Sequence, residues 1–147
     1  MKKLLVSISM LLTVAAFAND NTTTVTDEVK ASFKKEFPAA SLIEWDNKGE
    51  FSKATFLLWG QRTEAYFSED GKLQGSARTI FFNQLPLSVM TSVDKRFAGA
   101  EVLDIVEISN AEGTSYQLLV ETKERKFQVK ATATGGIYEV KKLKKAI

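Results

Sequence analysis

Cysteine and histidine are both absent from this sequence, and only two prolines occur among its 147 residues. Without cysteine the chain can form no disulfide, and it has no thiol to carry a lipid anchor. Histidine is the usual proton carrier near neutral pH, and together with cysteine it supplies the common ligands of zinc, copper and haem iron. These absences exclude much of enzyme chemistry, and we expect no catalytic residue, no metal site and no cofactor.

The first residues have the pattern of a secretory signal. Lys2 and Lys3 precede an apolar stretch (residues 4–17), and the Ala-Phe-Ala sequence that ends at Ala18 is a small-x-small cleavage site. The stretch is shorter than the roughly 20 residues that a membrane-spanning helix needs. We therefore expect a signal peptide over residues 1–18, cleavage after Ala18, and a periplasmic or secreted protein.

The chain that remains after the expected signal cleavage, called the mature chain below, also has no excess of positive or negative charge. Of the 20 Lys and Arg residues, two lie in the expected signal peptide, so the remainder balance the 18 Asp and Glu residues. A neutral chain gives no support for binding to nucleic acid or, after signal cleavage, to a membrane. The lysine-rich end (residues 141–145) is expected to be a solvated edge strand and a frayed terminus. The sequence leaves the oligomeric state open.

The sequence does contain an internal repeat at an offset of 60 positions. The recurring positions are Val29, Phe33, Phe37, Phe56 and Leu58 in the first copy and Val89, Val93, Phe97, Tyr116 and Leu118 in the second. They divide the region 27–147 into two repeats, 27–80 and 85–142, behind a polar and flexible leader over 19–26. A unit this short buries little surface alone, so we expect both units to share one core.

Each repeat is expected to begin with a helix. Thr26 and Asp27 can cap the first helix, the apolar residues that follow are spaced by four positions, and Pro38 ends it. The second helix is announced by Pro86 in its first turn and ends at Gly99.

The remaining sequence is typical of antiparallel strands. Eight segments have alternating or β-rich character: 41–45, 51–59, 63–68, 73–80, 101–109, 114–122, 125–133 and 137–142. Short turns such as Asp70-Gly71 and Gly135-Gly136 separate them, which antiparallel hairpins use. The expected fold class is α+β, a tandem repeat of a helix plus an antiparallel β-meander. Both helices should cover one face of a single long sheet or of two abutting sheets.

The repeat also predicts which strand positions face the helices. The positions expected to point inward are Ala54, Phe56, Leu58, Ala65, Phe67, Thr114, Tyr116, Leu118, Phe127, Val129 and Ala131. The opposite face then carries Leu57, Trp59 and Tyr66 in the first unit. In the second unit it carries Gln117, Leu119, Lys126, Gln128 and Lys130.

These residues resemble a family of small exported bacterial proteins described as PepSY-like or β-lactamase-inhibitor-like. The residues that carry the resemblance are Phe33, Phe37-Pro38, Trp45, Tyr66-Phe67, Asp70-Gly71, Leu85-Pro86 and Phe97-Ala98-Gly99. The resemblance covers residues 29–140 and implies a tandem α+β repeat, a periplasmic or secreted location, and a binding or inhibitory role without enzymatic activity. The second unit departs from the pattern, with Ile105 in place of Trp45 and Gly135-Gly136 in place of Asp70-Gly71.

Three further patterns have ordinary explanations. Serine and lysine are spaced as S-x-x-K at residues 32–35 and 92–95, but no partnering S-D-N or K-T-G motif occurs, so we expect no nucleophile there. The carboxylates of residues 46–50 and 69–70 are too few to hold calcium, which takes 6 to 8 oxygen ligands. Asp104 shares its strand phase with apolar residues, so it must find a partner, lie at an open edge, or be turned outward by a bulge.

The leading hypothesis is an exported binding module for a protein or peptide. Its site would be the open sheet face, with Leu57, Trp59 and Tyr66 as apolar anchors and Lys126 and Lys130 as charged steering groups, because aromatic side chains dominate protein contacts. Trp59 could instead be covered by a loop or by the first strand.

The alternative is a carrier or sensor of a small apolar ligand held between sheet and helices. Its ligand would lie near Phe33, Phe37, Phe56 and Phe97. An enzyme using the S-x-x-K lysines ranks third.

Overall fold

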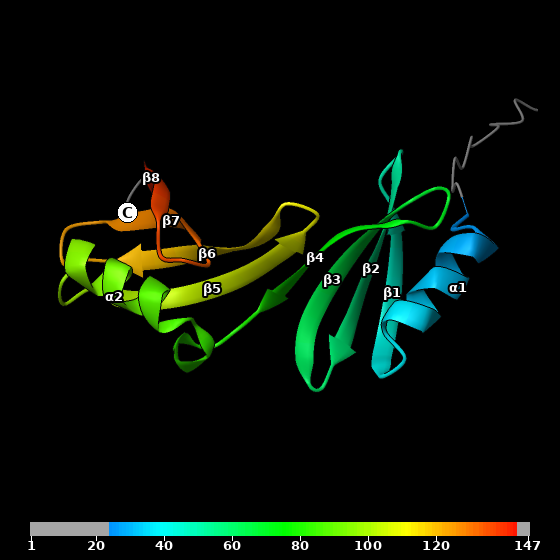
Figure 1. Cartoon of the computed structure of the whole chain (residues 1–147), viewed down its shortest axis with the longest axis horizontal. Coiled ribbons are helices and arrows are strands. Elements are labelled where there is room, and N and C mark those ends of the chain that lie inside the picture. Colours follow the sequence, from blue (N-terminus) through cyan, green and yellow to red (C-terminus); the bar gives the residue numbers. More distant parts are fainter. Residues whose placement is uncertain (1–23, 144–147) are drawn as a thin grey trace, which may run out of the picture.

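The computed structural model describes residues 24–143. The expected signal peptide, the leader up to residue 23 and the last two lysines of the basic tail lie outside this range. In chain order the elements are α1 (Asp27–Glu36), β1 (Ala40–Asn47), β2 (Phe51–Leu58), β3 (Gln61–Ser68), β4 (Leu73–Thr79), the 3-10 helix η1 (Phe82–Gln84), α2 (Leu87–Arg96), β5 (Glu101–Asn110), β6 (Gly113–Glu121), β7 (Lys126–Thr132) and β8 (Ile137–Lys142) (Figure 1). In the described range, neither helix is long and apolar enough to cross a membrane.

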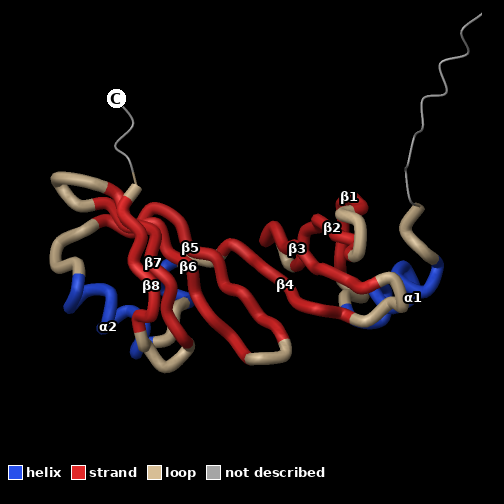
Figure 2. The backbone as a smooth tube through the Cα atoms, turned by 90° about the horizontal axis from the view of Figure 1, so that it is seen from above, coloured by secondary structure: helices blue, strands red, loops and turns tan. Residues whose placement is uncertain are grey.

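All eight strands form one antiparallel sheet in the order β1 to β8. The sheet is therefore continuous, which the sequence had left open. Strand register connects Phe56 to Thr63, Thr63 to Arg78, Arg78 to Glu107 and Glu107 to Tyr116 across the sheet, so these positions share one face. Both helices pack on that face, as expected. Figure 2 shows them near opposite ends of the molecule.

The helix termini follow from local sequence. The Thr26 side chain accepts a hydrogen bond from the backbone N–H of Val29 at 3.3 Å, which caps α1. The helix ends where the N–H of Phe37 donates to the carbonyl of Phe33 at 2.8 Å, directly before Pro38. Pro86 occupies the N-cap position of α2, one residue earlier than expected. The 3-10 helix η1 before it was not predicted.

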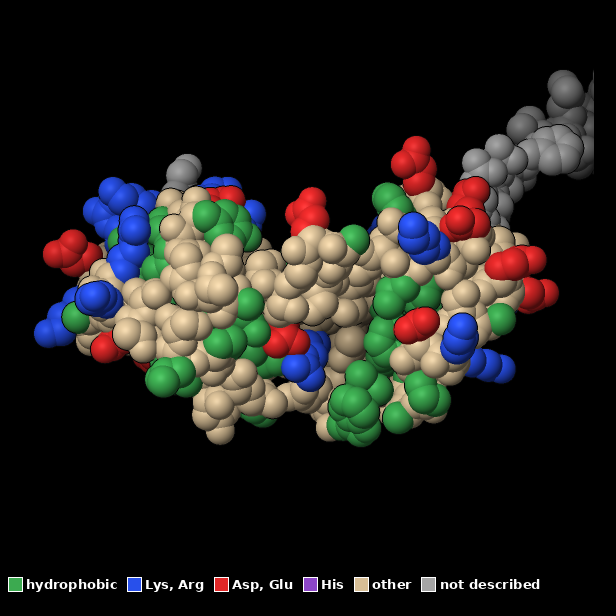
Figure 3. Space-filling view, in the orientation of Figure 1, with side chains coloured by type: hydrophobic (Ala, Val, Ile, Leu, Met, Phe, Trp, Pro, Cys, Tyr) green, Lys and Arg blue, Asp and Glu red, His purple; other side chains and the backbone are tan. Residues whose placement is uncertain are grey.

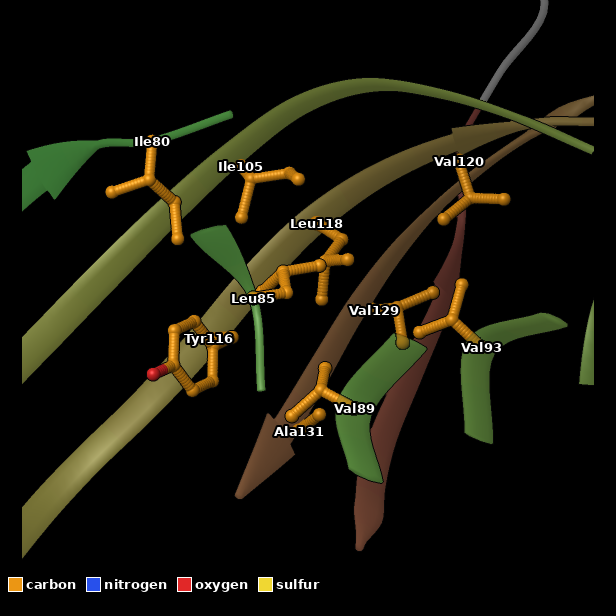
Figure 4. Close-up of a cluster of buried hydrophobic side chains, with 10 residues drawn as sticks. All are labelled: Ile80, Leu85, Val89, Val93, Ile105, Tyr116, Leu118, Val120, Val129 and Ala131. Atoms are coloured by element: carbon orange, nitrogen blue, oxygen red, sulfur yellow. The ribbon is translucent and has the colours of Figure 1, made fainter. Parts of the chain in front are cut away.

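The predicted alternation of inward and outward residues is confirmed. One buried cluster lies under α1 and contains Val29, Phe33, Ala54, Phe56, Ala65 and Phe67. A second lies under α2 and contains Ile80, Leu85, Val89, Val93, Ile105, Tyr116, Leu118, Val120, Val129 and Ala131. Figure 4 shows the second cluster, with side chains from both helix and strands pointing toward one another.

The expectation of one shared core is wrong, because these two clusters are separate. Between them the helix-bearing face of β4 and β5 is polar. Arg78 Nε donates to Glu107 Oε1 at 2.7 Å, and the Tyr116 hydroxyl donates to Glu107 Oε2 at 3.2 Å. A charged pair with satisfied hydrogen bonds fills the space where a joint apolar core would need aliphatic side chains. Each helix therefore covers its own core.

Two glycines hold equivalent hairpin turns against the helices. Gly71, after β3, has φ +81°, and a Cβ there would meet the Glu28 carbonyl oxygen at 3.0 Å; Gly135, after β7, has φ +88°, and its Cβ would meet the Ser88 carbonyl oxygen at 2.5 Å. In both turns the residue three positions before the glycine accepts its N–H bond, at 2.9 Å. Gly135, the first residue of the Gly135-Gly136 pair, therefore takes the place of Gly71, the second residue of Asp70-Gly71. The close packing of the turn against the helix is the same in both units.

Candidate functional site

The five predicted site residues are spread over the helix-free face. Leu57 and Tyr66 face away from the helices on β2 and β3, and Lys126 and Lys130 do so on β7. Since neighbouring strands lie about 4.8 Å apart, the four strand intervals from β3 to β7 separate these groups by about 19 Å. Trp59 lies beyond the end of β2, about 7 Å along the chain from Leu57, whereas Tyr66 pairs with Lys53 and so lies about 13 Å from Leu57 and about 20 Å from Trp59 along the hairpin. The sheet has a face that neither helix covers, as predicted, but these residues do not form one compact patch on it.

Trp59 is an exposed residue in a strained turn. It is 79% exposed and has φ +50°, and with Gly60 at φ +80° it forms the two-residue turn between β2 and β3. That backbone conformation favours Asn or Gly, and tryptophan there costs about 1–2 kcal/mol. The possibility that a loop or β1 covers Trp59 is therefore wrong. Leu42, at a bulge in β1, has the same φ and is 77% exposed.

The difference between the two tryptophans gives a direct test of this exposure. Acrylamide should quench the fluorescence of Trp59 efficiently and that of Trp45 weakly, because the Trp45 ring packs 5.2 Å from the Phe33 ring. The Trp59→Phe variant should therefore lose the accessible component and keep the shielded one, measured by Stern–Volmer titration, whereas Trp45→Phe should do the reverse. A Trp59 that acrylamide cannot reach would contradict the turn geometry.

The two lysines are neutralised by neighbouring carboxylates. Lys130 Nζ lies 3.0 Å from Glu139 Oε2 on β8, and Lys126 Nζ lies 3.6 Å from Glu121 Oε1 on β6. The hydrogen bond that Lys130 donates to Glu139, and next the negative charge of Glu139, raise the pKa of Lys130. Lys126 and Lys130 therefore contribute little to the long-range attraction of an acidic partner, because at a distance the positive charge of each lysine is largely cancelled by the negative charge of its carboxylate.

A groove lies on the helix-free face where the two units meet. It has a volume of about 380 Å³, and its apolar lining comes from Phe51, Tyr66, Ala77 and Ile108. Gly75 lies between Tyr66 and Asn110 in the strand register, so no side chain fills the space there. The groove is thus formed by β2 to β5 and draws on both repeats.

Tyr66 is held in this groove by a chain of polar contacts along β3. Its hydroxyl donates to Glu64 Oε2 at 3.0 Å, and Arg62 Nη2 lies 2.9 Å from Glu64 Oε1. Burial, and next the hydrogen bond with the Glu64 carboxylate, raise the pKa of Tyr66. The hydroxyl stays protonated at neutral pH, and the ring is positioned as a fixed wall of the groove.

The sequence had not identified three of the lining residues, Phe51, Ala77 and Ile108. Ala77 and Ile108 face each other in the β4–β5 ladder, which joins strands on either side of α2. A pairing across an intervening helix leaves no local trace in the sequence. Phe51 was detectable, because it is in the same strand phase as Leu57.

The patterns given ordinary explanations have local roles in the structure. The Ser32 and Ser92 hydroxyls lie against Gly71 and Gly135, where a larger side chain would crowd the turn, and Lys35 and Lys95 are exposed. Asp70 accepts a hydrogen bond from Ser68, which lowers the pKa of Asp70, and Asp46 lies 2.6 Å from Lys48. Across residues 24–143, no group of three or more acidic side chains is arranged to hold a metal ion.

Asp104 faces solvent on the helix-free side of β5, next to a bulge. The register shifts between Val102 and Asp104, so Leu103 is the extra residue; Val102 faces the helices, whereas Asp104 lies on the helix-free face with Val106 and Ile108. Of the three possibilities that the sequence left for Asp104, the bulge is the one that the structure contains. A bulge recurs in β1 between Ser41 and Glu44, which is a further sign of the repeat.

The residues named for a small-ligand carrier do not come together. Phe56 packs against Phe33 and Phe37, each with a ring-centroid distance of 4.9 Å, inside the first cluster. Phe97 belongs to the second unit, where it contacts Phe127 at 5.3 Å. The four rings therefore fill space in two different cores.

The fold matches several solved structures, although no protein-family model and no curated protein matches the sequence. A BLIP-like protein from Bacteroides fragilis superposes with a TM-score of 0.74 and 21% identity over 86% of this chain and 92% of its own. A Bacteroides eggerthii protein inferred to be periplasmic gives 0.73 and 19% over 81% and 89%. A DUF2874 family protein from Bacteroides uniformis gives 0.73 and 19% over 81% and 90%.

These identities establish likeness of fold alone. The β-lactamase-inhibitor-like part of the expected resemblance is confirmed at that level, and the PepSY part has no counterpart among these neighbours.

Proposed function

We propose that this chain is an exported, non-enzymatic module that binds a protein or peptide through the helix-free face of its sheet. The observation that carries the proposal is the apolar groove at the junction of the two units, which lies open on a face that neither helix covers. An apolar side chain of a partner could enter beside Phe51 and Tyr66 and bury surface that is now hydrated.

Further observations support this proposal. The signal-like pattern of residues 1–18 favours export, and one of the fold neighbours is inferred to be periplasmic. Another fold neighbour is described as BLIP-like, in agreement with the β-lactamase-inhibitor-like resemblance of the sequence. Trp59 gives a second apolar contact at the tip of the same hairpin that carries Tyr66, so a partner that spans the hairpin could contact both.

Variants of exposed residues can test the site without disturbing either core. The mature chain (residues 19–147) would be immobilised and used to capture proteins from a periplasmic extract. We expect Phe51→Ser and Trp59→Ala each to reduce a specifically captured protein about tenfold or more, the size of effect that interface anchors produce. Binding would be measured on the captured protein by surface plasmon resonance after its identification.

The matched control is Leu87→Ala, which removes a side chain that is 75% exposed but belongs to α2. This variant should bind as the unmodified chain does. Equal capture by Phe51→Ser and the unmodified chain, or loss of capture with Leu87→Ala alone, would contradict a site on the helix-free face.

A further inference from the structure

A second open pocket lies at the end of the molecule far from the groove. Its volume is about 890 Å³, and it is bounded by the C-terminal end of α2, the turn between β6 and β7, and the end of β8. The Phe97 and Phe127 rings, 5.3 Å apart, supply its apolar lining. This volume is within the range of about 300–1,000 Å³ that is typical of small-molecule sites.

The charge around this pocket is strongly positive. Arg96, Lys123, Arg125 and Lys142 line it, and Glu124 is the single acidic residue among its lining residues. In Figure 3 basic side chains gather at this end of the molecule, over α2 and the neighbouring strands. Although the mature chain as a whole is neutral, the charge is thus distributed unevenly.

Within the described residues these four cations lack acidic partners, as do six lysines elsewhere, but only these four line one pocket together. Six other Lys and Arg side chains lie within 4.0 Å of a carboxylate, but within residues 24–143 none of the four pocket cations does. The C-terminus of α2 carries about half a negative charge, which can account for one cation at most. The remaining positive charge has no internal partner.

The fold does not require this arrangement, because the first unit lacks it. The residue equivalent to Arg96 is Glu36 at the end of α1, and a two-residue turn, Trp59-Gly60, replaces the four residues 122–125. Two units of the same architecture therefore end in different chemistry, one with an exposed tryptophan and the other with a cationic pocket.

We infer that this pocket binds an amphipathic anion, a molecule with a carboxylate, sulfonate or phosphate head on an aromatic or alkyl body. The head would lie among Arg96, Arg125 and Lys142, and Arg can bind such groups through two parallel hydrogen bonds. The body would cover the edges of Phe97 and Phe127 and so gain apolar contact. This site is independent of the groove and of the proposed partner.

Three probes separate the two parts of this recognition. Anilinonaphthalene sulfonate has both the ring system and the anion, anilinonaphthalene has the rings alone, and inorganic phosphate has the charge alone. We expect the full mature chain to bind the sulfonate in a fluorescence titration and to bind anilinonaphthalene at least fivefold more weakly. Phosphate should bind so weakly that millimolar concentrations do not saturate the pocket. Raising the salt concentration should weaken binding of the sulfonate only.

The variants Arg96→Gln and Arg125→Gln should each weaken sulfonate binding about fivefold, the loss expected for one charge at a surface site. Lys35→Gln removes an exposed lysine at the end of α1 and should change nothing. Amide NMR shifts caused by the sulfonate should lie in residues 96–100 and 122–127, and circular dichroism would check that each variant is folded. Equal binding by all three variants, shifts confined to the groove, or equal affinity for the uncharged ring system would overturn the inference.

Discussion

Replacing Phe56 by alanine is expected to lower the free energy of unfolding by about 3–5 kcal/mol, a large fraction of the total for a domain of this size. The Phe56 side chain is 1% exposed, and its ring lies 4.9 Å from both Phe33 and Phe37. Its removal leaves a cavity that neighbouring rings cannot close, because each is fixed by α1 or by the strands. Urea denaturation followed by far-UV circular dichroism would measure the change.

Phe51→Ala provides the matched control, because Phe51 is on the same strand but faces the helix-free side and is 40% exposed. Its loss should cost less than about 1.5 kcal/mol, since an exposed side chain leaves no cavity. If both variants lost equal stability, the assignment of strand faces would be wrong. The comparison thus tests the alternation that positions the groove.

Gly135→Ala is the second substitution with a large expected effect, a loss of about 2–5 kcal/mol. Two costs combine. Alanine at φ +88° costs about 1–2 kcal/mol, and a Cβ 2.5 Å from the Ser88 carbonyl oxygen must push α2 away from the turn, as in an overpacked site. Chemical denaturation would give the total, and loss of hydrogen-exchange protection in α2 would locate the displaced element.

Two other glycines separate these costs. Gly49 has φ +80° with nothing within 4 Å of a Cβ, so Gly49→Ala should show the backbone cost alone. At Gly71 the Cβ would lie 3.0 Å from the Glu28 carbonyl oxygen, so the loss for Gly71→Ala should be intermediate. A loss at Gly49 as large as that at Gly135 would mean that contact with the helix plays no part.

The repeat was sufficient to predict most of the fold. The expected helix and strand boundaries agree with the structure to within about three residues, and the inward positions are buried or half-buried, because a period of two in strands and of four in helices is a local property of the sequence. The single core was predicted wrongly although the contrary signal was present. Ser76, Arg78, Glu107 and Ser109 occupy the inward positions of the two middle strands, and their polarity separates the clusters.

The candidate site was less predictable, because residues that line it are far apart in the sequence. Ala77 and Ile108 become neighbours only because β4 pairs with β5 across α2, and the sequence did not decide between one sheet and two. The bulge at Leu103 also shifts the phase of β5, so that a strict alternation counted from Val102 places Asp104 on the wrong face. Sequence periodicity thus predicts the face of a side chain and leaves its neighbours across the sheet undetermined.

Strictly sequential strand order has a kinetic consequence. Every strand hydrogen-bonds with the strand before or after it, so each hairpin can close without waiting for a distant segment, and loop-closure entropy stays small. The β4–β5 ladder is the exception, since η1 and α2 must be accommodated between its strands. Each half can therefore nucleate by itself, and formation of that central ladder completes the native molecule.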